Sequence, residues 1–187
     1  EKLCTAPNGV EPDEPLARPD RATIPELPPP VTLAGLAFRP VSRAELIEAI
    51  CLRAEHQVRT SVHYLNAHVF NMARRDPQLH ELLSACDLLY ADGISIVWAA
   101  RLLGYTVPCR LTAADYFVEC GRRCADQGLR LFLLGGAPGV AQAAAKTLAR
   151  AVPGLEIAGT FHGYLTPAES LEQIRRVFKK DIFPYLK

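Results

Sequence analysis

The stretch LRLFLLGGAPGVAQAAAKTLARAV, residues 129–152, constrains the fold of this chain more than any other part. It begins with an apolar run that is interrupted once, by Arg130, and that is typical of a strand buried on both faces of a sheet. Gly135, Gly136 and Gly139 follow, and small and apolar residues then recur at helical spacing. A buried strand, a glycine turn and a helix in this order predict one βα unit of a parallel sheet.

The same alternation recurs from residue 31 onward. VTLAGLAF (31–38), TSVHYLN (60–66), CDLLYAD (86–92) and LEIAGTFHGYL (155–165) predict strands. Helices are predicted at 42–56, with Ser42 and Glu45 at capping-box spacing, at 67–76, at 77–85 from Pro77, at 93–104, and at 116–128 before Gly128. We therefore predict an α/β fold, a Rossmann-like three-layer sandwich with a mainly parallel sheet.

Composition limits the kinds of partner. The 187 residues suit one domain, and 21 basic against 20 acidic residues leave a net charge of +1, which favours no nucleic-acid partner. Six scattered cysteines indicate reduced thiols; Cys120 and Cys124 could share a metal, although core packing is the favoured interpretation. Residues 1–30 are rich in proline and predict a disordered arm before an α/β domain at 31–187.

Ligands of parallel α/β sheets bind beyond the carboxyl ends of the strands, where the loops to the next helices gather. Polar or glycine-rich elements fall at four such ends in this chain. We expect them to meet at one rim of the sheet, and they are Asn66, Asp92 with Gly93, Gly135 with Gly136, and His162 with Gly163 and Tyr164.

Each of these elements has a structural and a functional interpretation. Asp92 is either the N-cap of the following helix or a general base that accepts a proton from an attacking hydroxyl. Asn66 either satisfies turn backbone or binds a polar ligand. Arg110 either neutralises a phosphate or pairs with Asp115 on the surface. Tyr64, on a strand, fits a core or inter-layer role better than chemistry.

The glycine-rich elements are equally open. Gly135 and Gly136 precede a helix, so they form either a phosphate cradle at its N-terminus or a plain tight turn. Tyr164 could stack on a pyrimidine, and Gly163 could permit an unusual turn beside His162, while ordinary loop packing is the competing interpretation.

Three segments in this order, YLNAHVFNMARRDPQLHELLSACDLLYADGISIVWAARLLG, RLTAAD and LRLFLLGGAPGVAQAAAKTLARAVPGLEIAGTFHGYL, resemble the WecG/TagA/CpsF family of bacterial glycosyltransferases over about residues 60–178. The resemblance implies inverting transfer of an N-acetylmannosamine-like or other hexose from a UDP donor. The implied acceptor is a polyprenyl-diphosphate-linked saccharide used in surface polysaccharide or teichoic acid synthesis. The implied place is the cytoplasm, at the inner face of the plasma membrane.

The resemblance also assigns roles to residues. Asp92 matches the family's proposed general base, and Asn66 and Arg110 match pocket residues. The nucleotide-contacting segments match at Gly135, Gly136 and Tyr164, with His162 and Gly163 in the same segment, while Gly93 and Asp115 lie in the other matched motifs. Tyr64 stands where the family usually has Thr, which bears on the donor sugar. The sequence has no convincing DxD motif, so we expect neither a metal nor another cofactor.

The end of the sequence leaves alternatives open. The chain stops at RRVFKKDIFPYLK, so we expect it to lack the family's last strand and its G-x-P-x-Q-E segment, and its basic tail could contact a membrane. An inactive, truncated family member that acts as a binding module is one alternative. The other is an NAD-type dinucleotide-binding oxidoreductase domain, because Glu156 follows the glycine turn near the spacing of a ribose-binding acid.

Overall fold

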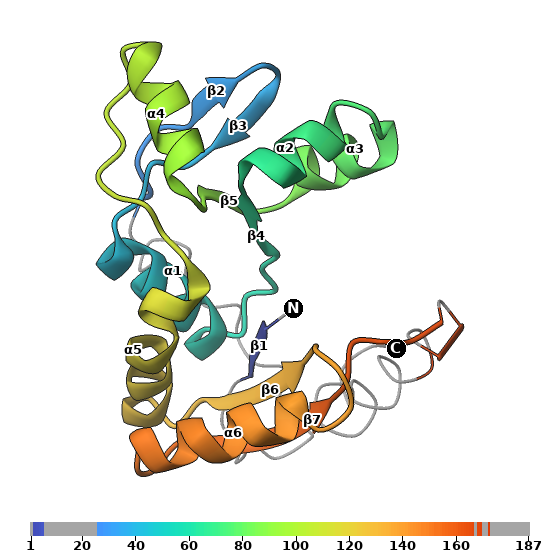
Figure 1. The fold of residues 1–187 in the computed structure, drawn as a ribbon. Helices are drawn as coiled ribbons and strands as arrows, with labels where there is room; N and C mark the ends of the chain where they lie inside the picture. The colour runs from blue at the N-terminus through green and yellow to red at the C-terminus, as the bar shows by residue number, and fades with distance from the viewer. Residues whose placement is uncertain (1, 6–25, 167, 170–171, 173–187) are drawn as a thin grey trace, which may run out of the picture. The chain divides into compact units, whose positions relative to one another are not determined.

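A computed structural model describes residues 2–5, 26–166, 168, 169 and 172 (Figure 1). The chain divides into two compact units, which we call the Asp92 unit (residues 19–120) and the Gly135 unit (residues 1–18 and 121–187). Both combine short parallel strand pairs with helices, so the predicted Rossmann-like α/β class is confirmed. None of the helices in the described ranges combines the length and the apolar character that a membrane crossing requires.

The Asp92 unit begins with a hairpin where the sequence predicted one strand. Strands β2 (Val31–Leu33) and β3 (Leu36–Phe38) pair antiparallel, so the prediction of a single strand over 31–38 is wrong. The turn residues Ala34 and Gly35 have φ of 44° and 92°. Positive φ at both central positions matches the twist of a two-residue hairpin, and the apolar letters of the sequence concealed this turn.

The centre of the Asp92 unit is a parallel strand pair. Strands β4 (Val62–Leu65) and β5 (Leu88–Ala91) pair in register from Val62 with Leu88 to Leu65 with Ala91. All four residues of β5 are buried, and the chain after β3 joins its other edge through the parallel bridge of Arg39 with Tyr90. Because β5 is covered on both sides, its carboxyl end delivers Asp92 from a fixed position.

Helices pack on these strands much as predicted. Helix α1 (Arg43–Glu55) begins with the expected capping box, in which Ser42 and Glu45 bond each other's backbone N–H groups, and α3 (Pro77–Ala85) begins at its proline. Helices α2 (Ala67–Ala73), α4 (Ile94–Leu102) and α5 (Ala113–Asp126) complete the set, and α5 starts three residues before its predicted beginning. Figure 1 shows α2 beside α3 and α4 beside the hairpin.

One apolar core holds the Asp92 unit together. It joins the inner faces of β2 and β3 to β5, α3 and α4, and buried side chains from each of these elements contact one another. Its members include Leu36, Phe38, Leu65, Leu83, Leu89, Ile96, Val97 and Val107. Burial of such side chains stabilises each by about 1.5–3 kcal/mol, so this core fixes the loops that carry Asn66 and Asp92.

The Gly135 unit is built around a second parallel pair. Strand β6 (Arg130–Leu134) pairs parallel with β7 (Glu156–Phe161) and antiparallel with β1 (Lys2–Thr5). Helix α6 (Val140–Ala151) lies along β6 and β7 (Figure 1). Within the predicted arm the structure describes β1 and residues 26–30, and the predicted basic tail falls outside the described residues apart from residue 172. The division into an arm and one domain therefore stays a prediction.

Candidate active site

Parallel pairing brings Asn66 and Asp92 together. The last register pair of β4 and β5 is Leu65 with Ala91, so the residue after each strand leaves the sheet at the same edge. The backbone N–H of Asp92 donates to the carbonyl of Leu65 at 2.8 Å, which continues the ladder by one bond. This part of the predicted rim is therefore present in the structure, and it is set by backbone pairing.

Two side chains hold the carboxylate of Asp92. The hydroxyl of Thr112 donates to Oδ1 at 2.9 Å, and the amide Nδ2 of Asn66 donates to Oδ2 at 3.3 Å. Each carboxylate oxygen has two lone pairs, so both oxygens keep capacity for a further donor. The carboxylate is half-buried, oriented by two neutral donors, and able to accept a proton.

Thr112 is a site residue that the sequence interpretation did not single out. The backbone N–H of Leu111 donates to the carbonyl of Ala91 at 3.2 Å, which places the residue before α5 next to Asp92. Only its occurrence in the segment RLTAAD could have pointed to Thr112. Its contact is with a residue twenty positions away in the sequence, and no local pattern encodes that distance.

The interpretation of Asp92 as a helix cap is wrong. The N-cap of α4 is Gly93, with φ 95° and ψ 146°, and the helix start has no side-chain cap bond. Such a φ favours glycine, and an added Cβ there would lie 3.7 Å from Cβ of Asn66. Asn66 is a cap instead, because its Oδ1 accepts from the N–H of Val69 at 2.9 Å at the start of α2. Asn66 thus serves the turn backbone and Asp92 together.

A pair of buried tyrosines lies near this carboxylate. The hydroxyls of Tyr90 and Tyr116 are 2.8 Å apart, and their rings meet edge to face. Burial raises the pKa of both phenols, and the mutual hydrogen bond and the charge of Asp92 raise that of Tyr90 further. Both phenols therefore stay neutral and act as fixed dipoles beside the site.

The other predicted residues of this unit lie at the surface. Tyr64 precedes the buried Leu65 and is 48% exposed, so the core part of the predicted core or inter-layer role is wrong. Arg110 donates from Nη2 to Oδ2 of Asp115 at 2.9 Å, and the two side chains are 51% and 37% exposed. This is the surface pair that the sequence left open as one alternative. A phosphate would compete with Asp115 for Nη2 of Arg110.

In the Gly135 unit, the loops after β6 and β7 close on each other. The N–H of Gly135 donates to the carbonyl of Phe161 at 3.0 Å, and the N–H of Gly163 donates to the carbonyl of Gly136 at 2.8 Å. A Cβ on Gly163 would lie 3.0 Å from Cα of Gly135 and 3.2 Å from N of Gly136. Glycine at residue 163 is required by this approach, which brings the two predicted glycine elements together.

His162 and Tyr164 flank this contact. The ring of His162 stacks on Phe161 at a centroid distance of 4.7 Å, and its Nδ1 is buried without a hydrogen-bond partner among the described residues. Tyr164 is 76% exposed. Ordinary loop packing is therefore wrong for the tyrosine, whose ring is free to stack on a planar ligand.

Comparison with known proteins decides the family. Residues 31–181 match the glycosyl transferase WecG/TagA/CpsF family. The chain belongs to this family. Among curated proteins it is similar to an N-acetylglucosaminyldiphosphoundecaprenol N-acetyl-beta-D-mannosaminyltransferase of Bacillus spizizenii, with 30% identity over 93 residues. That match covers 50% of this chain and 36% of the relative, so the chain spans about a third of the length of the relative it matches.

The alternative of a dinucleotide-binding domain depended on Glu156 as the ribose-binding acid. The position of Glu156 in the structure argues against that role, in agreement with membership of the WecG/TagA/CpsF family. In a dinucleotide fold the ribose-binding acid stands near the carboxyl ends of the strands. Glu156 instead begins β7, opposite Arg130 at the beginning of β6, and its carboxylate lies 3.8 Å from the Arg130 guanidinium. Gly135 follows the other end of β6, so Glu156 is at the wrong edge for a ligand held by the glycine loop.

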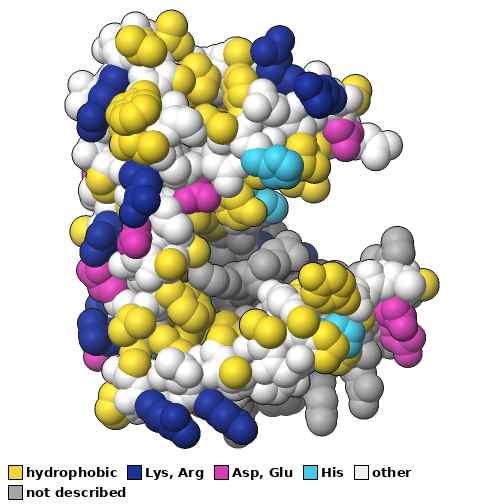
Figure 2. Space-filling model, in the orientation of Figure 1, with side chains coloured by type: hydrophobic (Ala, Val, Ile, Leu, Met, Phe, Trp, Pro, Cys, Tyr) yellow, Lys and Arg dark blue, Asp and Glu magenta, His cyan; other side chains and the backbone are white. Residues whose placement is uncertain are grey.

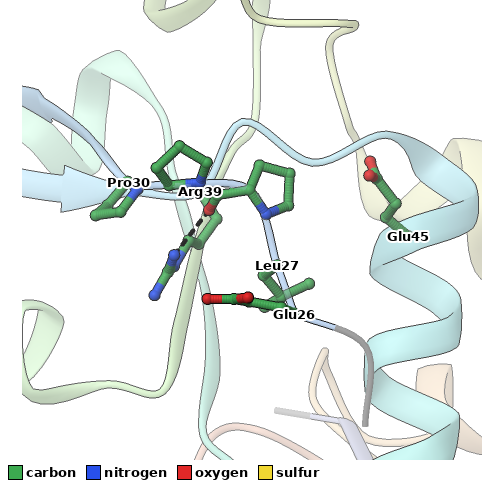
Figure 3. A pocket seen from close by; sticks show the side chains of 7 residues that line it. Glu26, Leu27, Pro30, Arg39 and Glu45 are labelled. Carbon is green, nitrogen blue, oxygen red and sulfur yellow. Dashed lines mark hydrogen bonds between the residues drawn. The ribbon is translucent and has the colours of Figure 1, made fainter.

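The Asp92 unit also has a pocket beside the end of the proline-rich segment, at residues 26–30. The pocket measures about 590 Å3 and is lined by residues 26–30, Arg39 and Glu45 (Figure 3). Arg39 donates to the carbonyl of Pro28 at 2.7 Å, and Glu45 accepts from the N–H of Ser42 at 2.7 Å. Two of the three charged residues of the lining, Arg39 and Glu45, are thus engaged in backbone contacts, and the third is Glu26.

Proposed function

We propose that this chain takes part in inverting transfer of a hexose, N-acetylmannosamine or a similar sugar, from a UDP donor to a polyprenyl-diphosphate-linked acceptor in cell-surface polymer synthesis. Family membership supports glycosyl transfer, and the relative's name supports that sugar and a diphosphoundecaprenol acceptor. The observation that carries the proposal is the oriented carboxylate of Asp92. It caps no helix, and it accepts hydrogen bonds from Thr112 and Asn66.

Asp92 would act as the general base. An acceptor hydroxyl attacks the anomeric carbon, a new carbon–oxygen bond forms, and its proton passes to a free lone pair of the carboxylate. The bond from the anomeric carbon to the donor phosphate breaks from the opposite face, and UDP leaves with that electron pair. Thr112 and Asn66 would keep the carboxylate oriented during this step. Their contacts would increase the rate of transfer, because a misplaced base reacts slowly.

For the donor, we assign the nucleotide to the Gly135 unit. A Cβ on Gly135 or Gly139 would meet no atom within 4 Å, so a ligand can approach the backbone there, and the exposed ring of Tyr164 offers a stacking surface for uracil. The N-terminus of α6, after Gly139, adds the partial positive charge that phosphate prefers. The buried Nδ1 of His162 is a further group that a ligand could bond.

We further propose that the transfer needs no divalent metal and occurs at the inner face of the plasma membrane. Arg110 would exchange Asp115 for the donor diphosphate as negative charge grows on the leaving group. A bidentate guanidinium contact is among the strongest ways to hold a phosphate without a metal.

A transfer assay tests the proposal. Full-length protein is incubated with UDP-N-acetylmannosamine and a lipid-linked N-acetylglucosamine acceptor, with and without EDTA, and the disaccharide product is analysed for anomeric configuration. We expect an inverted product at a rate that EDTA leaves unchanged. Absence of both transfer and UDP binding would contradict the proposal, and loss of transfer in EDTA would contradict its metal-independent form.

A further inference from the structure

Helix α4 is apolar on both of its faces. Its inner face, with Ile96, Val97 and Ala100, belongs to the core of the Asp92 unit. Its outer face carries Trp98, 60% exposed, and Leu102, 88% exposed. A surface helix normally has polar residues on its outer face, so an apolar outer face indicates a further partner.

The exposed apolar residues continue past the helix as one patch. We call it the α4 patch, and its members are Ile94, Trp98, Leu102, Leu103 and Tyr105. Within the helix the spacing of four residues from Ile94 through Trp98 to Leu102 puts these side chains on one face. Figure 2 shows hydrophobic side chains gathered over α4 at the upper left.

The charged side chain within the α4 patch is Arg101. From residue 94 to residue 109 the sequence contains Arg101 and no acidic residue, and the next arginine, Arg110, is paired with Asp115. Arg101 lines an open hollow together with Trp98 and Leu102, and its Nη2 donates to the carbonyl of Val107 at 3.1 Å, which holds the guanidinium beside the apolar side chains. Tryptophan and tyrosine prefer the membrane interface, and arginine is attracted to anionic headgroups.

We propose that the α4 patch docks on the surface of an anionic lipid bilayer. Trp98, Leu102 and Leu103 would enter the headgroup region, and Arg101 would contact lipid phosphates. The inference rests on the proposed function, in which the acceptor is lipid-linked. Since α4 begins two residues after Asp92, docking of this helix would bring the proposed base to the surface where such an acceptor lies.

The chain contains a single tryptophan, so Trp98 reports on the α4 patch alone. Full-length protein is titrated with phosphatidylcholine vesicles, with and without an equal part of phosphatidylglycerol, while its emission and its co-sedimentation are recorded. We expect a blue shift and quenching by brominated lipid with the anionic vesicles, and weaker binding at high salt. Absence of sedimentation, or sedimentation without a change in Trp98 emission, would overturn the proposal.

Matched variants separate this surface from others. Leu102→Gln with Leu103→Gln keeps the reporter and should lower vesicle binding at least about tenfold. Met72→Gln with Leu82→Gln, exposed residues of α2 and α3, should leave binding unchanged. Arg101→Glu should weaken binding to anionic vesicles only, with Arg74→Glu as its control.

Equal binding by the leucine variant would overturn the assignment of the patch. Sedimentation velocity that shows a dimer lost in that variant would assign the patch to a second copy and also overturn it. Transfer to a water-soluble acceptor analogue, measured in parallel, keeps failure of docking distinct from failure of the proposed function.

Discussion

The hydroxyl of Thr112 donates a hydrogen bond to Oδ1 of Asp92 at 2.9 Å, and the neighbouring Leu111 is hydrogen-bonded to Ala91, the last residue of β5. The bond orients a carboxylate that caps no helix and that Asn66 holds from its other oxygen. A carboxylate that is held by two neutral donors has a fixed orientation and still has free lone pairs that can accept a proton. The predictions below test what these contacts do.

Thr112→Val should lower kcat about tenfold, with little change in KM for the donor. The methyl group replaces the hydroxyl at nearly equal volume, so the carboxylate loses one neutral hydrogen bond worth about 0.5–1.5 kcal/mol. Steady-state kinetics measure the effect, and Thr112→Ser should restore most of kcat. A valine variant with native kcat would show that the bond has no part in catalysis.

Asn66→Ala should reduce both stability and transfer. Loss of the α2 cap lowers the free energy of unfolding by about 0.5–2 kcal/mol, and loss of the amide frees one oxygen of Asp92. Asp76→Ala is the matched control, because Asp76 caps α3 and the structure gives it no bond to Asp92. Denaturant unfolding and kinetics together should show equal destabilisation and a rate loss in the Asn66 variant alone.

Gly163→Ala should destabilise the Gly135 unit by about 1–3 kcal/mol and weaken UDP binding. The added methyl group would meet backbone atoms of Gly135 and Gly136, which cannot move as a side chain can. Gly121→Ala is the control, because its methyl group would meet flexible leucine side chains at 3.4 Å. Thermal unfolding and UDP titration measure both variants, and equal behaviour would contradict the close approach of the loops.

Asp87 should make folding stability depend on pH in the acid range. Burial alone would raise its pKa, but hydrogen bonds from the backbone and hydroxyl of Ser61 and the charge of Arg53 outweigh burial and lower the pKa of Asp87. A lowered folded-state pKa means stability that is present above the unfolded value, near 3.9, and lost as pH falls through the folded value.

Unfolding of the native protein and of Asp87→Asn, measured between neutral pH and about pH 3, tests this link. Asp87→Asn should be about 1 kcal/mol less stable at neutral pH and should lose less stability on acidification. The hydrogen bonds from Ser61 connect the beginning of β4 to the beginning of β5. The substitution should therefore destabilise the central strand pair. Parallel pH curves for the two proteins would be the contrary result.

Local chemistry made much of this fold predictable from the sequence. The capping box of Ser42 and Glu45 and the proline start of α3 depend on neighbours within one helical turn, and both are confirmed. The approach of Asn66 to Asp92 followed from the rule that parallel strands end at one edge, which needs only the order of strands and helices.

Contacts between distant segments were not accessible in the same way. The role of Thr112 depends on Leu111 pairing with Ala91, and no periodicity predicts that bond. The sequence places Asp92 just before a helix, where a capping residue is common. Only its hydrogen-bond partners in the structure distinguish a helix cap from a candidate general base. The turn at Ala34 was missed because alanine rarely adopts positive φ.

The most direct measurement compares Asp92→Asn with the native protein in transfer rate and in thermal stability. Asparagine keeps the shape of the side chain and, with one carbonyl oxygen, still accepts one of its two hydrogen bonds, but it cannot take a proton from the acceptor hydroxyl. The role of general base predicts a folded variant with nearly native Tm whose kcat falls by about 10²–10⁴. A folded variant that transfers sugar at the native rate would contradict it.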